Sequence, residues 1–96
     1  MAFAFLRRWL FRRPVQRPDL HVVLFTRTAC PLCDEAHEIL LRHQKQYGFL
    51  METKDVDESA DSRRDFGDCV PVVTINSTVR FRGDINEVLL RRMLEN

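Results

Sequence analysis

Two cysteines with two residues between them, Cys30-Pro31-Leu32-Cys33, are the residues of this chain best suited to chemistry. They follow the apolar run His21–Phe25 and precede a strongly helical stretch, so the first sulfur is expected at the start of a helix. Unpaired backbone N–H groups and the helix dipole stabilise a thiolate there. A thiolate attacks disulfides, and a second thiol nearby can resolve the mixed disulfide. The pattern predicts a redox-active dithiol, with Cys30 as nucleophile and Cys33 as resolving thiol.

The composition describes one ordinary globular domain that is not built to bind nucleic acid. The chain has 96 residues, of which 45% are apolar and 30% charged, and this length allows one modest core. Residues 19–96 carry ten Lys/Arg against fourteen Asp/Glu, a net charge of about −4. This part lacks the basic stripe with interleaved aromatics that marks nucleic-acid binders. An odd number of cysteines, three, disfavours a secreted disulfide framework, so we expect a reducing, cytoplasmic location.

Residues 1–18 form a separate basic extension. They contain five arginines and no acidic residue. The apolar residues fall near helical spacing: Phe3, Phe5, Leu6, Trp9 and Leu10. The apolar stretch is too short to span a membrane. It also lacks the basic-then-apolar order and the small-residue cleavage site of a signal peptide. Three roles stay open: peripheral contact with an anionic membrane, packing on the domain, and self-association. We expect residues 19–96 to fold without it.

The remaining pattern predicts an alternating α/β chain. Strands are expected at 21–26, 49–56, 72–75 and 78–82, the last two joined by a two-residue turn. A helix is expected to run to Tyr47 and end at Gly48. A short polar helix should begin at Asp57 or Ser59, and a last helix at Asp84, with Glu87 completing a capping box. The predicted order is β-α-β-α-β-β-α.

Three segments in this order resemble the glutaredoxins of the thioredoxin superfamily. They are Phe25–Cys33, with a basic residue three before the first cysteine, Val70-Pro71-Val72-Val73, and Phe81-Arg82-Gly83-Asp84. The resemblance covers about residues 20–96 and is greatest to the short glutaredoxin-like proteins of bacteria. It implies a thioredoxin-like fold, with a four-stranded mixed sheet flanked by helices.

The resemblance also implies a substrate site around the dithiol. Pro71 would follow a cis peptide bond that exposes the backbone of Val70 to an extended thiol substrate, which could pair with it as an added strand. Arg27 would stabilise a thiolate or hold a substrate carboxylate, or else is a solvated strand-end residue. Asp84 would reach the amino group of a γ-glutamyl moiety, or else only caps the last helix.

Three positions depart from the family pattern. Leu32 replaces the usual tyrosine between the cysteines, Cys69 replaces the threonine before Val-Pro, and Gly83 stands alone where the family has two glycines. The resemblance places Cys69 on a loop that faces the Cys-x-x-Cys turn. Cys69 is then either a small packing residue or a third thiol that exchanges with Cys30 or completes a three-sulfur metal site.

The histidines do not form a recognisable metal motif. His37 lies one turn beyond Cys33, but the chain lacks the second paired set of ligands found in zinc ribbons. We expect His21, His37 and His43 to be solvated or packing residues, and no metal site.

These observations predict a thiol–disulfide oxidoreductase of glutaredoxin type. Its dithiol Cys30-Pro31-Leu32-Cys33 would reduce disulfide-containing proteins or glutathione mixed disulfides, with glutathione as a candidate co-substrate and no tightly bound cofactor. Two alternatives stay open. One is a module that carries a metal or an iron–sulfur cluster on Cys30, Cys33 or an added thiol. The other is a non-catalytic interaction domain.

Overall fold

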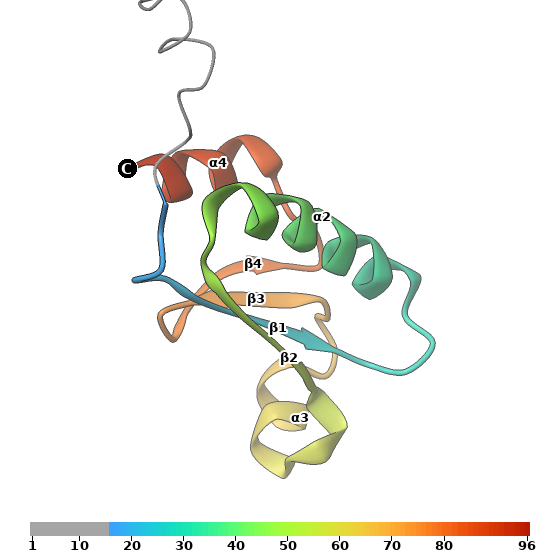
Figure 1. Cartoon of the computed structure of the whole chain (residues 1–96). Helices are drawn as coiled ribbons and strands as arrows, with labels where there is room; N and C mark the ends of the chain where they lie inside the picture. The colour runs from blue at the N-terminus through green and yellow to red at the C-terminus, as the bar shows by residue number, and fades with distance from the viewer. Residues whose placement is uncertain (1–15) are drawn as a thin grey trace, which may run out of the picture.

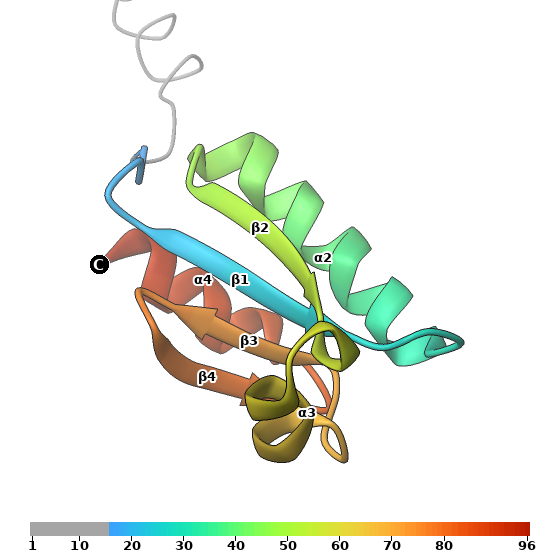
Figure 2. The ribbon, with the colours of Figure 1, turned by 90° about the horizontal axis from the view of Figure 1, so that it is seen from below.

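The structure is a computed structural model that describes residues 16–96. Most of the basic extension, residues 1–15, therefore lies outside the described residues. One four-stranded sheet organises the rest, in the strand order β2-β1-β3-β4 (Figure 2). The strands are β1 (His21–Thr26), β2 (Leu50–Asp55), β3 (Val72–Ile75) and β4 (Thr78–Arg82). β1 pairs parallel to β2 and antiparallel to β3, which pairs antiparallel to β4, so the sheet is mixed as predicted.

Helices complete the thioredoxin-like α/β fold. They are α2 (Pro31–Tyr47), the 3₁₀ turn η1 (Val56–Glu58), α3 (Ala60–Phe66) and α4 (Glu87–Glu95). α2 and α4 lie side by side on one face of the sheet, whereas α3 lies beyond the end of β2 on the opposite side (Figure 1). The parallel pair of β1 and β2 needs a crossover connection, which α2 supplies. No helix among residues 16–96 is long and apolar enough to cross a bilayer.

The core forms where α2 and α4 cover the sheet. Alternate residues of β1, Val22 and Leu24, are fully buried there against Leu40 of α2 and Leu90 of α4. On the other face of the sheet, the ring of Phe25 packs against Phe66 of α3 at a centroid distance of 4.8 Å. Because β1 carries apolar side chains on both faces of the sheet, its sequence is a continuous hydrophobic run.

Two predicted chain reversals are confirmed. Gly48 ends α2 with φ 70°, and its N–H donates to the Gln44 carbonyl at 2.8 Å, which is the usual role of glycine at this position. Asn76 and Ser77 have φ values of 49° and 70°. Positive φ at both positions suits a two-residue hairpin turn, and asparagine adopts it more readily than most residues.

The predicted start of the last helix was wrong. Asn86, not Asp84, caps α4, because its side chain accepts a hydrogen bond from the Leu89 N–H at 3.1 Å. Ile85 is buried at 6% exposure, and Asn86 after it still has an extended backbone, so the helix begins only at Glu87. Glu87 is therefore the first helical residue and cannot form the predicted capping box; its carboxylate lies 3.0 Å from His43 Nε2.

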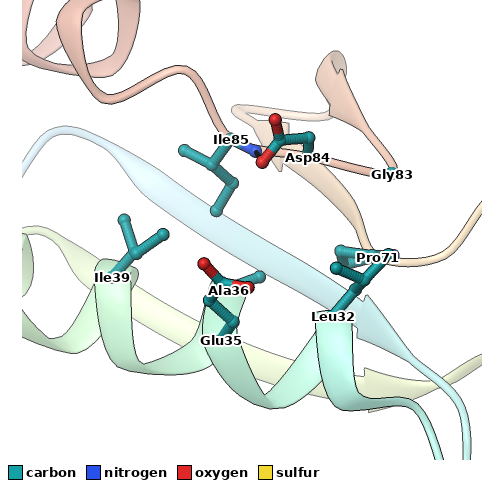
Figure 3. A pocket seen from close by; sticks show the side chains of 8 residues that line it. All are labelled: Leu32, Glu35, Ala36, Ile39, Pro71, Gly83, Asp84 and Ile85. Carbon is teal, nitrogen blue, oxygen red and sulfur yellow. Dashed lines mark hydrogen bonds between the residues drawn. The ribbon is translucent and has the colours of Figure 1, made fainter.

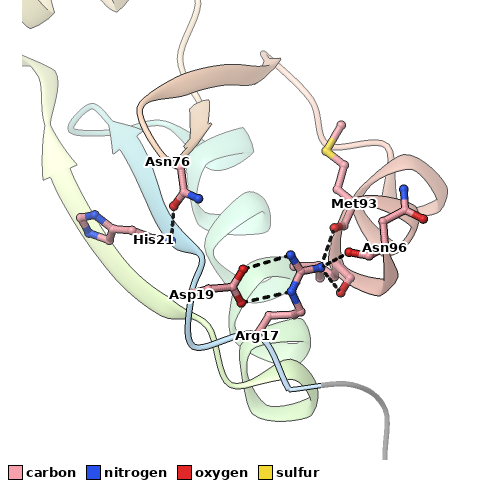
Figure 4. A network of polar contacts seen from close by, with 7 residues as sticks. Arg17, Asp19, His21, Asn76, Met93 and Asn96 are labelled. Carbon is pink, nitrogen blue, oxygen red and sulfur yellow. Dashed lines mark hydrogen bonds and ion pairs between the residues drawn. The ribbon is translucent and has the colours of Figure 1, made fainter.

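Arg17 joins the end of the basic extension to the domain (Figure 4). Its Nη1 donates to the carbonyls of Leu94 and Asn96 at 2.9 and 2.8 Å, at the end of α4. Its backbone N–H donates to the carbonyl of Tyr47 at 2.7 Å, at the end of α2. Asp19 accepts two hydrogen bonds from the same guanidinium, and these lower the pKa of Asp19. One cation thus satisfies carbonyls at a helix end that have no partner within the helix.

Replacing Arg17 by methionine should lower the melting temperature by about 5 °C, because the α4 carbonyls lose a charged donor. Thermal denaturation followed by circular dichroism measures this. Asp19→Asn is the matched control. It weakens the ion pair but leaves the carbonyl contacts, so its effect should be smaller. Equal melting temperatures for the unsubstituted protein and both variants would show that the Arg17 contacts do not stabilise the domain.

Candidate redox site

The two predicted redox cysteines lie at the start of α2. Cys30 is the N-cap, Pro31 is the first helical residue, and Cys30 and Cys33 form a disulfide with their Cα atoms 5.2 Å apart. Pro31 costs no hydrogen bond at this position, because a first-turn N–H has no partner in the helix. The Cys33 N–H lies 3.1 Å from Cys30 Sγ. The backbone therefore presents a donor to the sulfur that would carry charge after reduction.

The two cysteine residues differ in exposure. Cys33 is 2% exposed and belongs to the buried set, whereas Cys30 is half-buried at the turn between β1 and α2. An incoming disulfide can thus reach Cys30 more readily than Cys33. This is the geometry that the predicted roles of nucleophile and resolving thiol require.

A small pocket adjoins the dithiol (Figure 3). Its lining comes from the first turns of α2, from Pro71 and from the segment between β4 and α4: Leu32, Glu35, Ala36, Ile39, Pro71, Gly83, Asp84 and Ile85. Leu32, which stands between the two cysteines in sequence, is part of this lining.

The Val70-Pro71 peptide bond is cis. The Pro71 carbonyl accepts a hydrogen bond from the Gly83 N–H at 2.7 Å, which fixes this loop against the start of the final segment. The backbone N–H and C=O of Val70 form no hydrogen bond within residues 16–96. Pairing of this backbone with an extended substrate, the role that we predicted for Val70, stays a prediction.

The guanidinium of Arg27 is held by contacts within the protein itself. Nε and Nη2 donate to the two carboxylate oxygens of Asp57 at 3.0 and 2.9 Å, and Nη1 donates to the Gly67 carbonyl at 2.8 Å. The hydrogen bonds between Arg27 and Asp57 raise the pKa of Arg27 and lower the pKa of Asp57. The end of β1 is thereby tied to η1 and to the end of α3. A direct substrate contact by Arg27 stays a prediction.

Cys69 is a free thiol on the loop that leads into the cis peptide bond. Its Sγ lies 3.5 Å from the Phe66 carbonyl and 3.6 Å from Nη1 of Arg82. Residues 16–96 contain no group of three or more His, Cys, Asp or Glu side chains placed to hold a metal ion. The three-sulfur metal site is therefore not formed by the described residues. Of the other two roles predicted for Cys69, packing and exchange with Cys30, neither is tested by this geometry.

The histidines occupy packing and surface positions. His43 is 8% exposed, and its Nε2 pairs with Glu87 of α4. His21 pairs with Glu52 on the neighbouring strand at 3.2 Å. His37 is half-buried on α2. Each agrees with the expectation of solvated or packing histidines.

Sequence reasoning missed three residues around the site. Asp57 holds Arg27, Arg82 lies against the Cys69 thiol, and Glu35 lines the pocket. Asp57 and Arg27 are 30 residues apart, and no local pattern joins them. Glu35 could have been found from its place in the first turns of the helix after Cys33.

The family comparison agrees with this geometry. The description of the family whose sequence model matches residues 21–95 is Glutaredoxin-like domain (DUF836). The chain belongs to this glutaredoxin-like family. An uncharacterized protein of Mycobacterium tuberculosis is 35% identical over 82 residues, which cover 80% of this chain and 82% of the relative. A probable thioredoxin of Methanothermobacter marburgensis is 32% identical over 65 residues, covering 65% of this chain and 76% of the relative.

Solved thioredoxins share the fold of this glutaredoxin-like protein. Thioredoxin-2 of the malaria parasite superimposes with a TM-score of 0.60 at 22% identity, covering 78% of this chain and 80% of that one. Oxidised mitochondrial thioredoxin 3 of Saccharomyces cerevisiae gives 0.59 at 19% identity, covering 96% and 87%. At this identity the likeness shows the fold alone. The glutaredoxin-like family and the Cys30–Cys33 pair at disulfide distance together indicate a redox function.

Asp57→Asn should destabilise the domain at neutral pH but not in acid. Because Arg27 lowers the pKa of Asp57, the ion pair stabilises the fold above the ordinary pKa and is lost as pH falls through the lowered one. The stability difference from the unsubstituted chain should shrink as the pH falls below the ordinary carboxyl pKa of about 4 and vanish once the pH has passed through the lowered one. Urea unfolding over a pH series measures it.

Arg27→Gln is the matched partner for this test, because it removes the cation and leaves the carboxylate. If the two residues act as a pair, the double variant should lose no more of the pH-dependent stability than either single variant. A stability difference that stays constant from neutral to acid pH would contradict the pairing.

Cys69→Thr should leave the Cys30–Cys33 chemistry unchanged. A threonine hydroxyl can donate to the Phe66 carbonyl as the thiol does, so the free energy of unfolding should change by less than about 1 kcal/mol. Mass spectrometry of gently oxidised protein should find a bridge between Cys30 and Cys33 only. A bridge from Cys69 to either cysteine would show instead that the third thiol takes part in exchange.

Proposed function

We propose that this protein is a thiol–disulfide oxidoreductase that reduces disulfides of protein substrates, or mixed disulfides with glutathione, through Cys30. The observation that carries the proposal is the disulfide between a half-buried N-cap cysteine and a buried cysteine of the next turn. The described structure corresponds to the oxidised form of this dithiol.

The first step uses the reduced enzyme. The Cys30 thiolate attacks one sulfur of the substrate disulfide, and the bond between the two substrate sulfurs breaks. One substrate thiol leaves with a proton from solvent, and the other half stays joined to Cys30 as a mixed disulfide. The Cys33 N–H, 3.1 Å from Cys30 Sγ, stabilises the attacking thiolate. The residues of the substrate beside its reactive cysteine can pair with the backbone of Val70. This is supported by the absence of hydrogen bonds from the Val70 N–H and C=O among residues 16–96.

The second step releases the substrate. Cys33 loses its proton and attacks Cys30 Sγ, so that the mixed disulfide breaks and the Cys30–Cys33 disulfide forms. The substrate has gained two electrons and two protons, and the dithiol has lost them. Burial of Cys33 limits its reaction with outside disulfides, while its position one turn along α2 keeps it within bonding reach of Cys30.

A thiol donor must then restore the dithiol. Two molecules of glutathione, or the dithiol of a reductase, would supply the two electrons. The probable thioredoxin among the relatives supports a protein disulfide as substrate. The chemistry needs no tightly bound cofactor, because both electrons reside on the cysteine sulfurs.

Cys30→Ser should abolish disulfide reduction, because no other described residue supplies a helix-start thiolate. Cys33→Ser should accumulate mixed disulfides or keep partial activity when glutathione can resolve them. Reduction of hydroxyethyl disulfide with glutathione, and of insulin with thioredoxin reductase, measures both. Mass spectrometry detects the trapped adduct.

Assays run separately with each electron source, glutathione and thioredoxin reductase, also distinguish glutathione-dependent from reductase-dependent turnover. Cys69→Ser is the matched control for removal of a thiol, and its effect on either assay should be small. Activity of Cys30→Ser equal to that of the unsubstituted protein would remove the enzymatic interpretation.

A further inference from the structure

An open groove runs between α2 and the strand β2. Its lining includes Leu41 and Gln44 of α2, the helix end Gly48, and Leu50, Met51 and Thr53 of β2. The pocket beside the dithiol is lined by other residues of α2, among them Ala36 and Ile39. By the helical repeat, the two sets lie on opposite flanks of α2. In the groove, Leu41 is 38% exposed and Leu50 is 59% exposed, so both leucines are open to solvent.

The groove lies at an edge of the sheet that α2 covers incompletely. β2 is an edge strand, since the strand order is β2-β1-β3-β4. Thr53 of β2 pairs with Leu24 of β1 and therefore points to the same face of the sheet, the face that carries the core. Leu24 is fully buried, whereas Thr53 is exposed. Proteins commonly protect such an edge by covering it with a helix or loop.

The described chain begins at one end of this groove. Gln16 is its first residue, and its Nε2 donates to the Gln46 carbonyl in the last turn of α2 at 2.9 Å. A Cβ atom built on Gly48, which lines the groove, would clash with the Gln16 side chain. The start of the described chain accordingly lies beside the turn between α2 and β2 (Figures 1 and 2). Residues 1–15 therefore join the domain at the Gly48 end of the groove.

The length and composition of residues 1–15 suit the groove. The stretch of α2 beside it, from His37 to Tyr47, is about 15 Å long, and fifteen residues reach about 22 Å as a helix and about 50 Å when extended. The segment holds six large apolar side chains: Phe3, Phe5, Leu6, Trp9, Leu10 and Phe11. It is therefore long enough and apolar enough to cover the exposed leucines.

The two parts of the chain also carry opposite charge. Residues 1–15 contain four arginines and no acidic residue, whereas residues 16–96 contain eleven Lys/Arg and fourteen Asp/Glu, a net charge of about −3. The exposed charges on this flank of α2 are Asp34 and Glu38 towards its start and Lys45 towards its end. Opposite net charge favours contact between the segment and the domain.

We propose that the apolar side chains of residues 3–11 occupy this groove on their own domain. The contact buries Leu41 and Leu50 and covers the exposed edge of β2. Of the three roles left open for the basic extension, this assigns packing on the domain. The groove and the pocket beside the dithiol lie on opposite flanks of α2, so the contact leaves disulfide reduction unobstructed and does not depend on the proposed function.

The test uses the fluorescence of Trp9, which is the sole tryptophan of the chain and so reports on this segment alone. In the full-length reduced protein, its emission should lie to the blue of that of a free tryptophan amide, and acrylamide should quench it less, because the ring leaves water. In Leu41→Gln/Leu50→Thr the emission should shift to the red. The quenching constant should rise by roughly twofold or more, because the groove loses two apolar side chains.

Leu89→Gln on α4 is the matched control. It makes the same change at a helical leucine that is 43% exposed and lies outside the groove, so the Trp9 emission should stay unchanged. Circular dichroism melts check that every variant is folded, and Leu41→Gln alone keeps the test available if the double variant is not. Reduction of hydroxyethyl disulfide should be the same in all variants, because none of them alters the redox turn.

Two further measurements distinguish this occupant from others. Sedimentation equilibrium over a range of protein concentrations should find a monomer whose Trp9 emission does not change with concentration. Emission that moves to the blue only as dimers form would overturn the proposal in favour of the groove of a second copy. A blue shift that appears only when phosphatidylglycerol vesicles are added would overturn it in favour of a membrane surface.

The groove itself is tested by the variants. Trp9 emission and quenching equal to those of the free amide in the unsubstituted protein would overturn the proposal. A protected Trp9 that does not respond to Leu41→Gln/Leu50→Thr would also overturn it, because the segment would then pack elsewhere. Neither outcome bears on the dithiol, whose activity the hydroxyethyl disulfide assay measures separately.

Discussion

The start of α2 is the constraint on which the rest of the site depends. A helix begins with backbone N–H groups that have no partner within it, and here one of them, from Cys33, points at the sulfur of the N-cap residue Cys30. The same geometry shields Cys33 in the next turn. The Cys33 N–H and the Cys30 sulfur therefore serve both the start of the helix and the thiol chemistry. The site depends on the rigid placement of this helix more than on a deep cavity.

The packing of the domain supplies that rigidity. α2 and α4 share one face of the sheet, and their buried leucines meet the alternate side chains of β1. At the far end of the helices, Arg17 contacts carbonyls at the end of α4 and its N–H donates to the carbonyl of Tyr47 in α2. At the near end, the ion pair of Arg27 with Asp57 fixes the strand that leads into the redox turn. Hydrophobic burial thus holds the helices on the sheet, and the electrostatic contacts fix their ends.

The charged side chains near the redox turn are held in different ways. Arg27, the basic residue before the first cysteine, is ion-paired with Asp57 and donates to the Gly67 carbonyl. Glu35 and Asp84 are instead exposed at the pocket that Leu32 helps to line.

The strands at 72–75 and 78–82, the helix end at Gly48 and the Cys30–Cys33 pair were predictable from sequence, because each depends on local patterns of apolar residues, turns or spacing. The cap of α4 was not, since Ile85 is buried, the backbone of Asn86 after it is still extended, and the cap is Asn86 rather than Asp84. The partners of Arg27, Arg17 and Cys69 were likewise decided only by the tertiary structure. Local spacing sets backbone geometry and reactive groups, whereas long-range side-chain partners depend on how distant segments pack, which no local pattern encodes.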